Sequence, residues 1–194
     1  MGPPFGKNTT RMRTTNLQLT PHAPEHLRAL IAGPERYGQI FGVPPAQGLR
    51  DFLVSDEISP EFLAGLEEAT EADPWTHGFA LVHAADRIVI GMCGFKGPPD
   101  GDDMVEIAYG VVPAYQSKGL ATEAARALVR YAFASGRDVR VVRAHTLPRP
   151  NASARVLTKC GFERVGEVVD PEDGPVWRWE KYGGDDDDQQ QEPR

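Results

Sequence analysis

The sequence predicts a mixed α/β domain in which strands and helices do not alternate regularly. Residues 105–112 alternate and are rich in β-branched and aromatic side chains, which is typical of a strand. Residues 120–135 place leucine, valine and alanine at helical spacing, which predicts a long helix directly afterwards. Several strand-like segments follow one another between residues 79 and 112, and this order does not fit a regularly wound β-α-β sheet.

The amino-terminal part of the domain begins with a strand and a helix. Residues 16–20 alternate as a strand does, and the apolar residues from Leu27 to Ile31 have helical spacing. Gly33 and Pro34 mark the end of this helix.

Residues 34–74 give the weakest signal, because prolines interrupt them repeatedly. Helical patches at residues 49–54 and 60–69 nevertheless predict a helical segment that covers one side of the domain.

The remainder of the domain is predicted to consist mainly of strands, separated by turns at residues 85–87, 97–101 and 173–174. The expected elements are strands at 79–84, 88–95 and 105–112, a helix at 120–135, a strand at 139–146, a helix at 151–159, and strands at 162–169 and 176–182.

Length and composition indicate one ordinary globular domain. The chain has 194 residues, of which 40% are hydrophobic and 25% charged. We expect a loose leader at residues 1–13, a single domain at 14–182 and a disordered acidic tail at 183–194. No apolar run approaches the roughly 20 residues that span a membrane, and no signal peptide is recognisable, so we expect a cytoplasmic protein.

The charge is negative and unevenly distributed. The net charge is −7, to which residues 1–13 contribute +3 and residues 185–194 contribute −4. An acidic body disfavours nonspecific binding of nucleic acid and suits a cationic acceptor such as an amine. Cys93 and Cys160 stand in apolar surroundings and are expected to be buried and unpaired, and no cysteine or histidine spacing indicates a metal site.

The short segment between the strand at 105–112 and the long helix predicts an anion site. The first turn of a helix has N–H groups without intrahelical partners, and a glycine there lets a phosphate approach closely. The spacing matches neither a P-loop nor a dinucleotide-binding loop. The alternative is an ordinary turn whose glycine only eases packing. The candidate residues are Gln116, Ser117, Lys118, Gly119, Leu120 and Ala121.

The pattern Gln-x-x-Gly-x-Ala in this segment resembles the coenzyme A pyrophosphate loop of the GCN5-related N-acetyltransferases (GNAT). Further motifs in the expected order extend the resemblance over residues 14–182: Ile90-Gly91, Gly94-Phe95, Glu106 to Gly110, and Asn151 to Phe162. The chain is most similar to the branch that includes ribosomal-protein alanine N-acetyltransferases. The resemblance implies the GNAT fold, a central mixed and mostly antiparallel sheet flanked by helices, with acetyl-CoA as cosubstrate and no metal.

The resemblance also implies contacts with the pantetheine arm of acetyl-CoA. In relatives this arm lies along the fourth strand, which carries over to the backbone groups of Val111 and Val112. A backbone N–H near Val111 is the candidate for polarising the thioester carbonyl. Asn151 matches an asparagine that contacts the arm, and Ser153 is a second candidate. The alternative is that both valines only pack in the core and that Asn151 only caps a helix.

Glu106 is the candidate general base. Alternation places Val105 and Ile107 on one face of the strand, and Glu106 on the other with two small residues, which leaves a groove beside the carboxylate. A carboxylate beside such a groove suits removal of a proton from an amine, directly or through water. Two alternatives remain open: Glu106 is a structural ion-paired residue, or His145 is the base.

The proton donor to the leaving thiolate is not assigned. Many relatives carry a tyrosine in the helix at 151–159, where this chain has Leu157. Tyr109, Tyr115, Ser153 or a water could replace it, or the thiolate leaves without help.

The predicted function is transfer of the acetyl group of acetyl-CoA to a primary amine, directly and within a ternary complex. The acceptor is expected to be a protein N-terminal amine or a small-molecule amine. A non-catalytic acyl-CoA-binding module and a transferase of larger acyl groups are the alternatives. The two strands at the carboxyl end could also mediate a homodimer.

Overall fold

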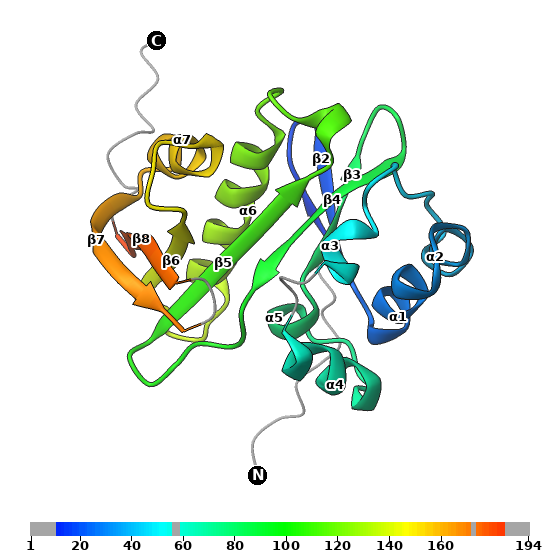
Figure 1. The fold of residues 1–194 in the computed structure, drawn as a ribbon, viewed down its shortest axis with the longest axis horizontal. Coiled ribbons are helices and arrows are strands. Elements are labelled where there is room, and N and C mark those ends of the chain that lie inside the picture. Colours follow the sequence, from blue (N-terminus) through cyan, green and yellow to red (C-terminus); the bar gives the residue numbers. More distant parts are fainter. Residues whose placement is uncertain (1–10, 56–58, 172–173, 185–194) are drawn as a thin grey trace.

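A computed structural model describes residues 11–55, 59–171 and 174–184. In these ranges the chain forms an eight-stranded sheet with the order β1-β2-β3-β4-β5-β6-β8-β7. Neighbouring strands are antiparallel, with one exception, the parallel pair of β5 and β6. The predicted mixed, mostly antiparallel sheet flanked by helices is therefore confirmed (Figure 1).

The strands are β1 (Met12–Arg13), β2 (Leu17–Pro21), β3 (Phe79–His83), β4 (Ile88–Phe95), β5 (Met104–Val111), β6 (Val141–Thr146), β7 (Glu163–Asp170) and β8 (Gly174–Tyr182). The helices are α1 (Pro24–Ala32), α2 (Pro34–Phe41), α3 (Asp51–Val54), α4 (Pro60–Glu68), α5 (Pro74–His77), α6 (Leu120–Ala134) and α7 (Ala152–Lys159). A short 3₁₀ helix, η1 (Pro113–Tyr115), joins β5 to the segment before α6.

Two elements differ from the sequence expectation. Met12 and Arg13, expected in the loose leader, form β1 and pair with β2. Pro34 does not only follow α1: it is the first residue of α2, because proline fits the first turn of a helix, where its missing N–H costs nothing. The expected leader at residues 1–10 and tail at 185–194 lie outside the described residues.

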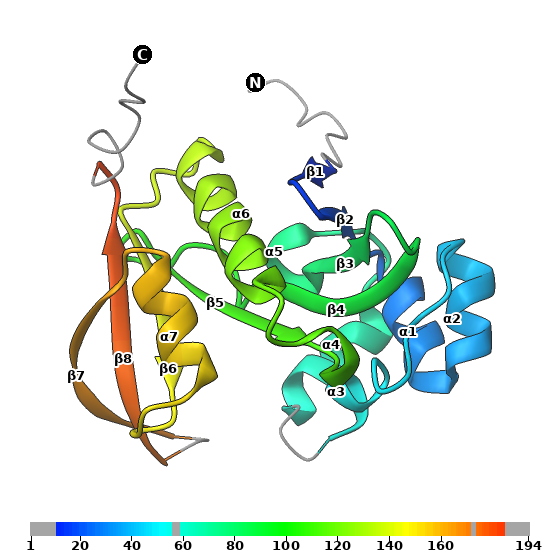
Figure 2. The same cartoon turned by 90° about the horizontal axis from the view of Figure 1, so that it is seen from above.

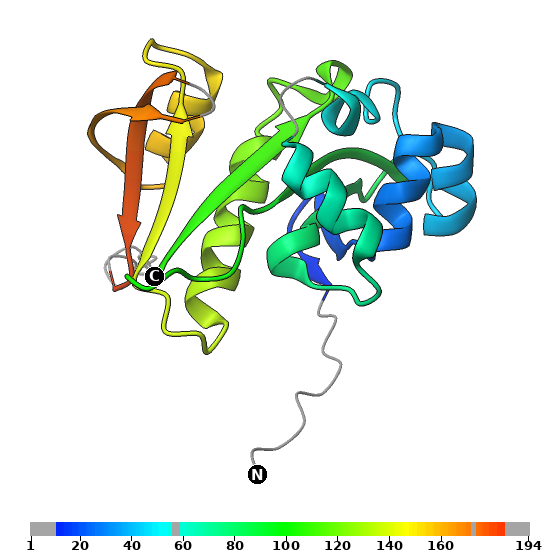
Figure 3. The ribbon, with the colours of Figure 1, turned by 60° about the horizontal axis from the view of Figure 1, so that its bottom comes forward.

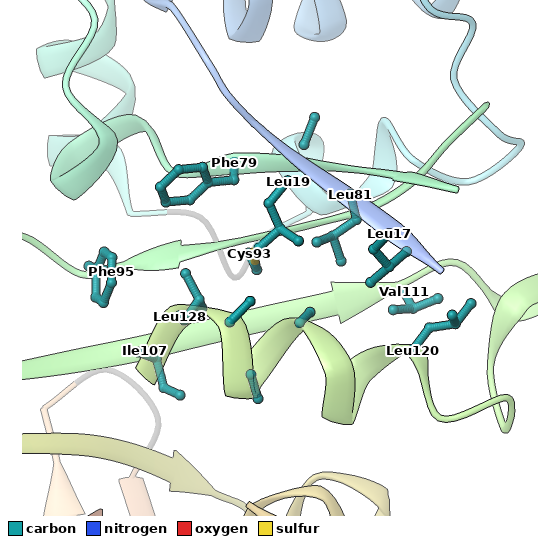
Figure 4. Packing of buried hydrophobic residues seen from close by; sticks show 14 of the residues in the cluster. Leu17, Leu19, Phe79, Leu81, Cys93, Phe95, Ile107, Val111, Leu120 and Leu128 are labelled. Carbon is teal, nitrogen blue, oxygen red and sulfur yellow. The ribbon is translucent and has the colours of Figure 1, made fainter. Parts of the chain in front are cut away.

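Helices lie on both faces of the sheet. α6 and α7 cover one face, whereas α1 to α4 gather on the opposite side beside β2 to β5 (Figures 1 and 2). The core lies between α6 and the sheet: Leu120 and Leu128 of α6 pack with buried side chains of β2, β3 and β5, as Figure 4 shows. Cys93 and Cys160 are buried and unpaired, as expected.

The sheet divides between β5 and β6. These two strands pair through Met104–Val141, Val105–Val142 and Glu106–Arg143, and then part (Figure 3). β5 continues for five more residues to Val111 along its other neighbour, β4. Among the described residues, the edge of β5 that points toward β6 therefore has no strand partner beyond Glu106.

Glu123, in the first turns of α6, holds the start of β2. Its carboxylate accepts hydrogen bonds from the Thr14 hydroxyl, from the Asn16 amide (2.6 Å) and side chain (3.0 Å), and from the Leu17 amide (3.1 Å). Partial burial acts to raise the pKa of Glu123, but these hydrogen bonds outweigh it and hold the pKa below the ordinary 4.5.

Replacing Glu123 by glutamine is expected to lower the free energy of unfolding by about 1–2 kcal/mol at pH 7, because charged hydrogen bonds at a partly exposed site are lost. Since the folded-state pKa is lowered, this stabilisation is complete above pH 4.5 and disappears as the pH falls through the folded-state value. Urea unfolding from pH 7 to pH 3 measures it, with the exposed Glu68→Gln in α4 as control. An unfolding difference that does not shrink toward pH 3 would contradict this origin.

Candidate active site

The segment before α6 presents backbone N–H groups to solvent. Ser117 (φ 60°) and Gly119 (φ 79°) adopt the left-handed conformation, and α6 begins at Leu120. Within the described ranges, the amides of residues 117–121 make no hydrogen bond. Consecutive unpaired amides at a helix N-terminus form a concave anion-binding site. A Cβ added at Gly119 meets no atom within 4 Å, so this surface is open to a phosphate.

Two side chains of this loop have contacts of their own. The Gln116 side chain donates a hydrogen bond to the Val111 carbonyl (2.8 Å) and so fastens the loop to the end of β5. The Lys118 ammonium lies over the ring of Tyr115, 4.8 Å from its centre, beside the amide-rich turn. The loop therefore combines N–H donors with one positive charge.

The two valines at the end of β5 differ in what their backbones offer. The Val112 amide donates to the Ile90 carbonyl (2.9 Å), and the Val112 carbonyl accepts from the Tyr115 amide (2.9 Å). Since alternate residues of a strand point their backbone groups in opposite directions, Val111 faces the open edge toward β6. Val111 therefore offers a backbone N–H to an extended arm such as pantetheine, whereas both backbone groups of Val112 already have partners.

Glu106 lies on the face of β5 opposite α6, and its side chain is 19% exposed. Val105 and Ile107 are buried on the other face, so the predicted alternation is confirmed. Glu106 Oε1 is 2.9 Å from Lys96 Nζ and 3.1 Å from His145 Nδ1. Glu106 is therefore ion-paired, as one of the alternatives expected, and it lies next to His145, the other candidate base.

His145 stands on β6 beyond the point where the strands part. Its two ring nitrogens are buried and make no hydrogen bond within the described ranges, although Nδ1 lies close to Glu106. Glu106 pairs with Arg143 in register, and His145, two residues further along β6, points to the same face. Local sequence patterns offered little support for this histidine, because its contact with Glu106 depends on the order of strands in the sheet.

A cavity of about 170 Å³ opens beside Glu106 on this face. Four residues further along β5 the same face is covered, because a Cβ at Gly110 would lie 3.2 Å from the Phe52 ring of α3. The groove expected along the small residues of β5 is therefore limited by Phe52 at the end away from Glu106. The lining of the cavity is formed by Lys96, Gly97, Pro98, Asp100, Met104, Val105, Glu106 and Arg143.

Asn151 caps α7. Its Oδ1 accepts from the Ala154 amide (2.8 Å), and its Nδ2 donates to the carbonyls of Leu147 (3.2 Å) and Arg149 (2.8 Å). Both amide hydrogens are used, so a further ligand can only donate to the remaining lone pair of Oδ1. Ser153 is exposed in the first turn of α7.

Tyrosine hydroxyls were the alternatives for the proton donor, and only one lies between β5 and α7. Leu157 is fully buried and offers no proton. The Tyr115 hydroxyl is bonded to Asp86 (2.6 Å). The Tyr109 hydroxyl reaches across to α7 and donates to the Ser153 carbonyl (3.4 Å), and burial raises the pKa of Tyr109, which keeps it protonated.

In the ranges that the structure describes, none of the helices is both long and apolar enough to cross a bilayer. No three histidine, cysteine, aspartate or glutamate side chains in those ranges gather as metal ligands would.

Comparisons with known proteins agree with this geometry. The family model of the acetyltransferase (GNAT) domain matches residues 16–163. No curated protein sequence matches the chain significantly. Several solved structures resemble this chain at low sequence identity, and they support the assignment of the fold.

The ribosomal-protein-S5-alanine acetyltransferase from Vibrio fischeri has a TM-score of 0.60 at 16% identity, covering 91% of this chain and 98% of its own. RimL, the ribosomal L7/L12 α-N-protein acetyltransferase in complex with coenzyme A, has 0.61 at 16%, covering 89% and 98%. The microcin C7 self-immunity acetyltransferase MccE, in complex with acetyl-CoA and AMP, has 0.58 at 14%, covering 87% and 93%. With the family model matching most of its length, the chain belongs to the GNAT acetyltransferase family.

Proposed function

We propose that this protein transfers the acetyl group of acetyl-CoA to the primary amine of a second substrate, directly and within a ternary complex. The observation that carries the proposal is the parting of β5 and β6, which puts the amide-rich loop at Gln116–Ala121 at one end of an open strand edge and Glu106 near the other. The similarity to ribosomal-protein acetyltransferases supports a protein N-terminal amine as acceptor, and a small-molecule amine is compatible with the same chemistry.

Binding of acetyl-CoA would use the backbone more than side chains. The free amides of residues 117–121 suit the pyrophosphate, and Lys118 adds a positive charge. The Val111 N–H, at the open edge of β5, would align the pantetheine arm. An N–H of the same edge that lies nearer Glu106 would polarise the thioester carbonyl. Holding both substrates in one geometry supplies a large part of the rate.

The chemical step would need a base and an acid on opposite faces of β5. Glu106, with His145 beside it, would take a proton from the ammonium form of the acceptor. The amine nitrogen then bonds to the thioester carbon and releases its second proton to water, and the carbon–sulfur bond breaks. Tyr109, on the face of α6 and α7, would give its proton to the thiolate and regain one from water.

Gly119→Ala is expected to weaken acetyl-CoA binding about tenfold or more in a calorimetric titration, because a side chain strains the left-handed backbone and covers the amides. Gly136→Ala is a matched control: Gly136 follows the other end of α6, also has a positive φ (70°), and also has open space around an added Cβ. Equal loss of affinity in the two variants would show that the loop does not bind the cosubstrate.

Glu106→Gln is expected to lower kcat by about 100-fold or more, the size of a lost general base, while the Kd for acetyl-CoA stays unchanged. Thiol release with an amine acceptor measures the rate, and the exposed Glu167→Gln on β7 is the control. The His145→Gln variant, measured alongside, separates the two candidates. Full turnover in Glu106→Gln together with a loss in His145→Gln would assign the base to His145 instead.

Tyr109→Phe is expected to lower kcat about tenfold or more without weakening acetyl-CoA binding, because the hydroxyl proton is lost while the ring keeps its packing. Tyr115→Phe is the matched control, since its hydroxyl is bonded to Asp86 outside this gap. An unchanged kcat in Tyr109→Phe would indicate that water or Ser153, and not Tyr109, protonates the thiolate.

A further inference from the structure

Arg143 is a partly buried cation without hydrogen bonds beside the candidate base. It stands on β6 directly opposite Glu106 on β5, and its side chain is 21% exposed. Within the described ranges none of its five N–H donors makes a hydrogen bond, and its Nε is fully buried. Its nearest recorded anion, Glu180 Oε1, is 3.6 Å from Nε, which is too long for a hydrogen bond.

The carboxylates around Arg143 already have other partners. Glu180 accepts hydrogen bonds from Arg178 (2.6 Å) and from the Tyr182 hydroxyl (2.8 Å). Lys96 pairs with Glu106, as described above. Asp100 Oδ1, at the far wall of the cavity, accepts from the amides of residues 102 (2.9 Å) and 104 (3.1 Å). No carboxylate on this face is therefore left with Arg143 as its main partner.

A partly buried guanidinium with unused donors favours an anionic ligand. Leaving the buried Nε donor without a hydrogen bond is costly, and a carboxylate restores two parallel hydrogen bonds at once. Arg143 lines the same cavity of about 170 Å³ as Glu106, near the start of β5, whereas the loop before α6 follows the other end of this strand. The ligand that meets Arg143 there is therefore the acceptor and not the phosphates of acetyl-CoA.

We propose that the acceptor carries a carboxylate a few bonds from the amine that is acetylated, and that Arg143 binds this carboxylate while Glu106 faces the amine. This rests on the proposed function. Paired residues of adjacent strands are about 5 Å apart, so both groups of the acceptor fit within one amino acid residue. Two sources share this chemistry: a free α-amino acid, or a peptide whose first residue is acidic.

The experiment compares acceptors that differ in one charge. One arm sets alanine against alaninamide, and the other sets a C-terminally amidated peptide that begins with aspartate against the same peptide beginning with asparagine. Acetyl transfer from acetyl-CoA is followed by thiol release, and the ratio of kcat/KM within each pair is the readout. The proteins are the wild type, Arg143→Gln, Arg143→Lys and the control Arg140→Gln. The Arg140 side chain is 80% exposed and forms an ion pair with Asp103.

In one of the two pairs, the wild type is expected to show a kcat/KM about tenfold or more higher for the acceptor that carries the carboxylate. This is the size of a charged hydrogen bond. The ratio should fall to about one in Arg143→Gln, be intermediate in Arg143→Lys, which lacks the planar fork, and remain in Arg140→Gln. The arm that shows the preference identifies the source of the carboxylate.

Ratios near one in both arms of the wild type would overturn this proposal while acetyl transfer itself stands, and this comparison needs no variant to fold. A preference that persists in Arg143→Gln would also overturn it, by assigning the carboxylate to another residue. Absence of transfer to all four acceptors would overturn it as well, whereas a protein that also fails to bind acetyl-CoA would contradict the proposed function.

Discussion

The site depends on a parallel strand pair that ends early. Backbone N–H and C=O groups need partners, and a strand inside a sheet finds them on both sides. β5 is paired with β4 along its length but with β6 only up to Glu106, so the backbone groups of Ile107, Tyr109 and Val111 point toward a gap. The loop before α6 begins where this gap ends, and Gln116 binds the last carbonyl of the edge. An extended ligand arm of strand-like character suits such an edge because it supplies the missing partners.

Local patterns in the sequence were sufficient for most of the elements. Helical spacing gives α6, alternation gives β5 with Glu106 and Ile107 on opposite faces, and the residue types before α7 give its cap at Asn151. These features depend on neighbours within a few residues along the chain, which is the range over which periodicity and capping act.

The contacts around Glu106, on the proposed acceptor side of β5, could not be predicted from such local patterns. Glu106 meets His145 and Arg143 because β5 and β6 lie side by side, although almost 40 residues separate these positions along the chain. Phe52 reaches β5 from a short helix in the proline-rich part of the chain, where spacing carried little information. The overall negative charge of the chain also did not predict the role proposed for Arg143. Net charge acts at long range and is screened within about 8 Å, whereas a guanidinium acts at contact distance.

The contacts of Glu123 matter for the electrostatics of the phosphate loop. A carboxylate in the first turns of a helix favours the helix itself but repels any anion bound at the same end. Here Thr14, Asn16 and Leu17 direct four donors at that carboxylate and draw its charge away from the helix end. Neutral donors at the start of β2 thus offset part of this negative charge, and losing them would add negative potential at the loop without removing any residue of the loop itself.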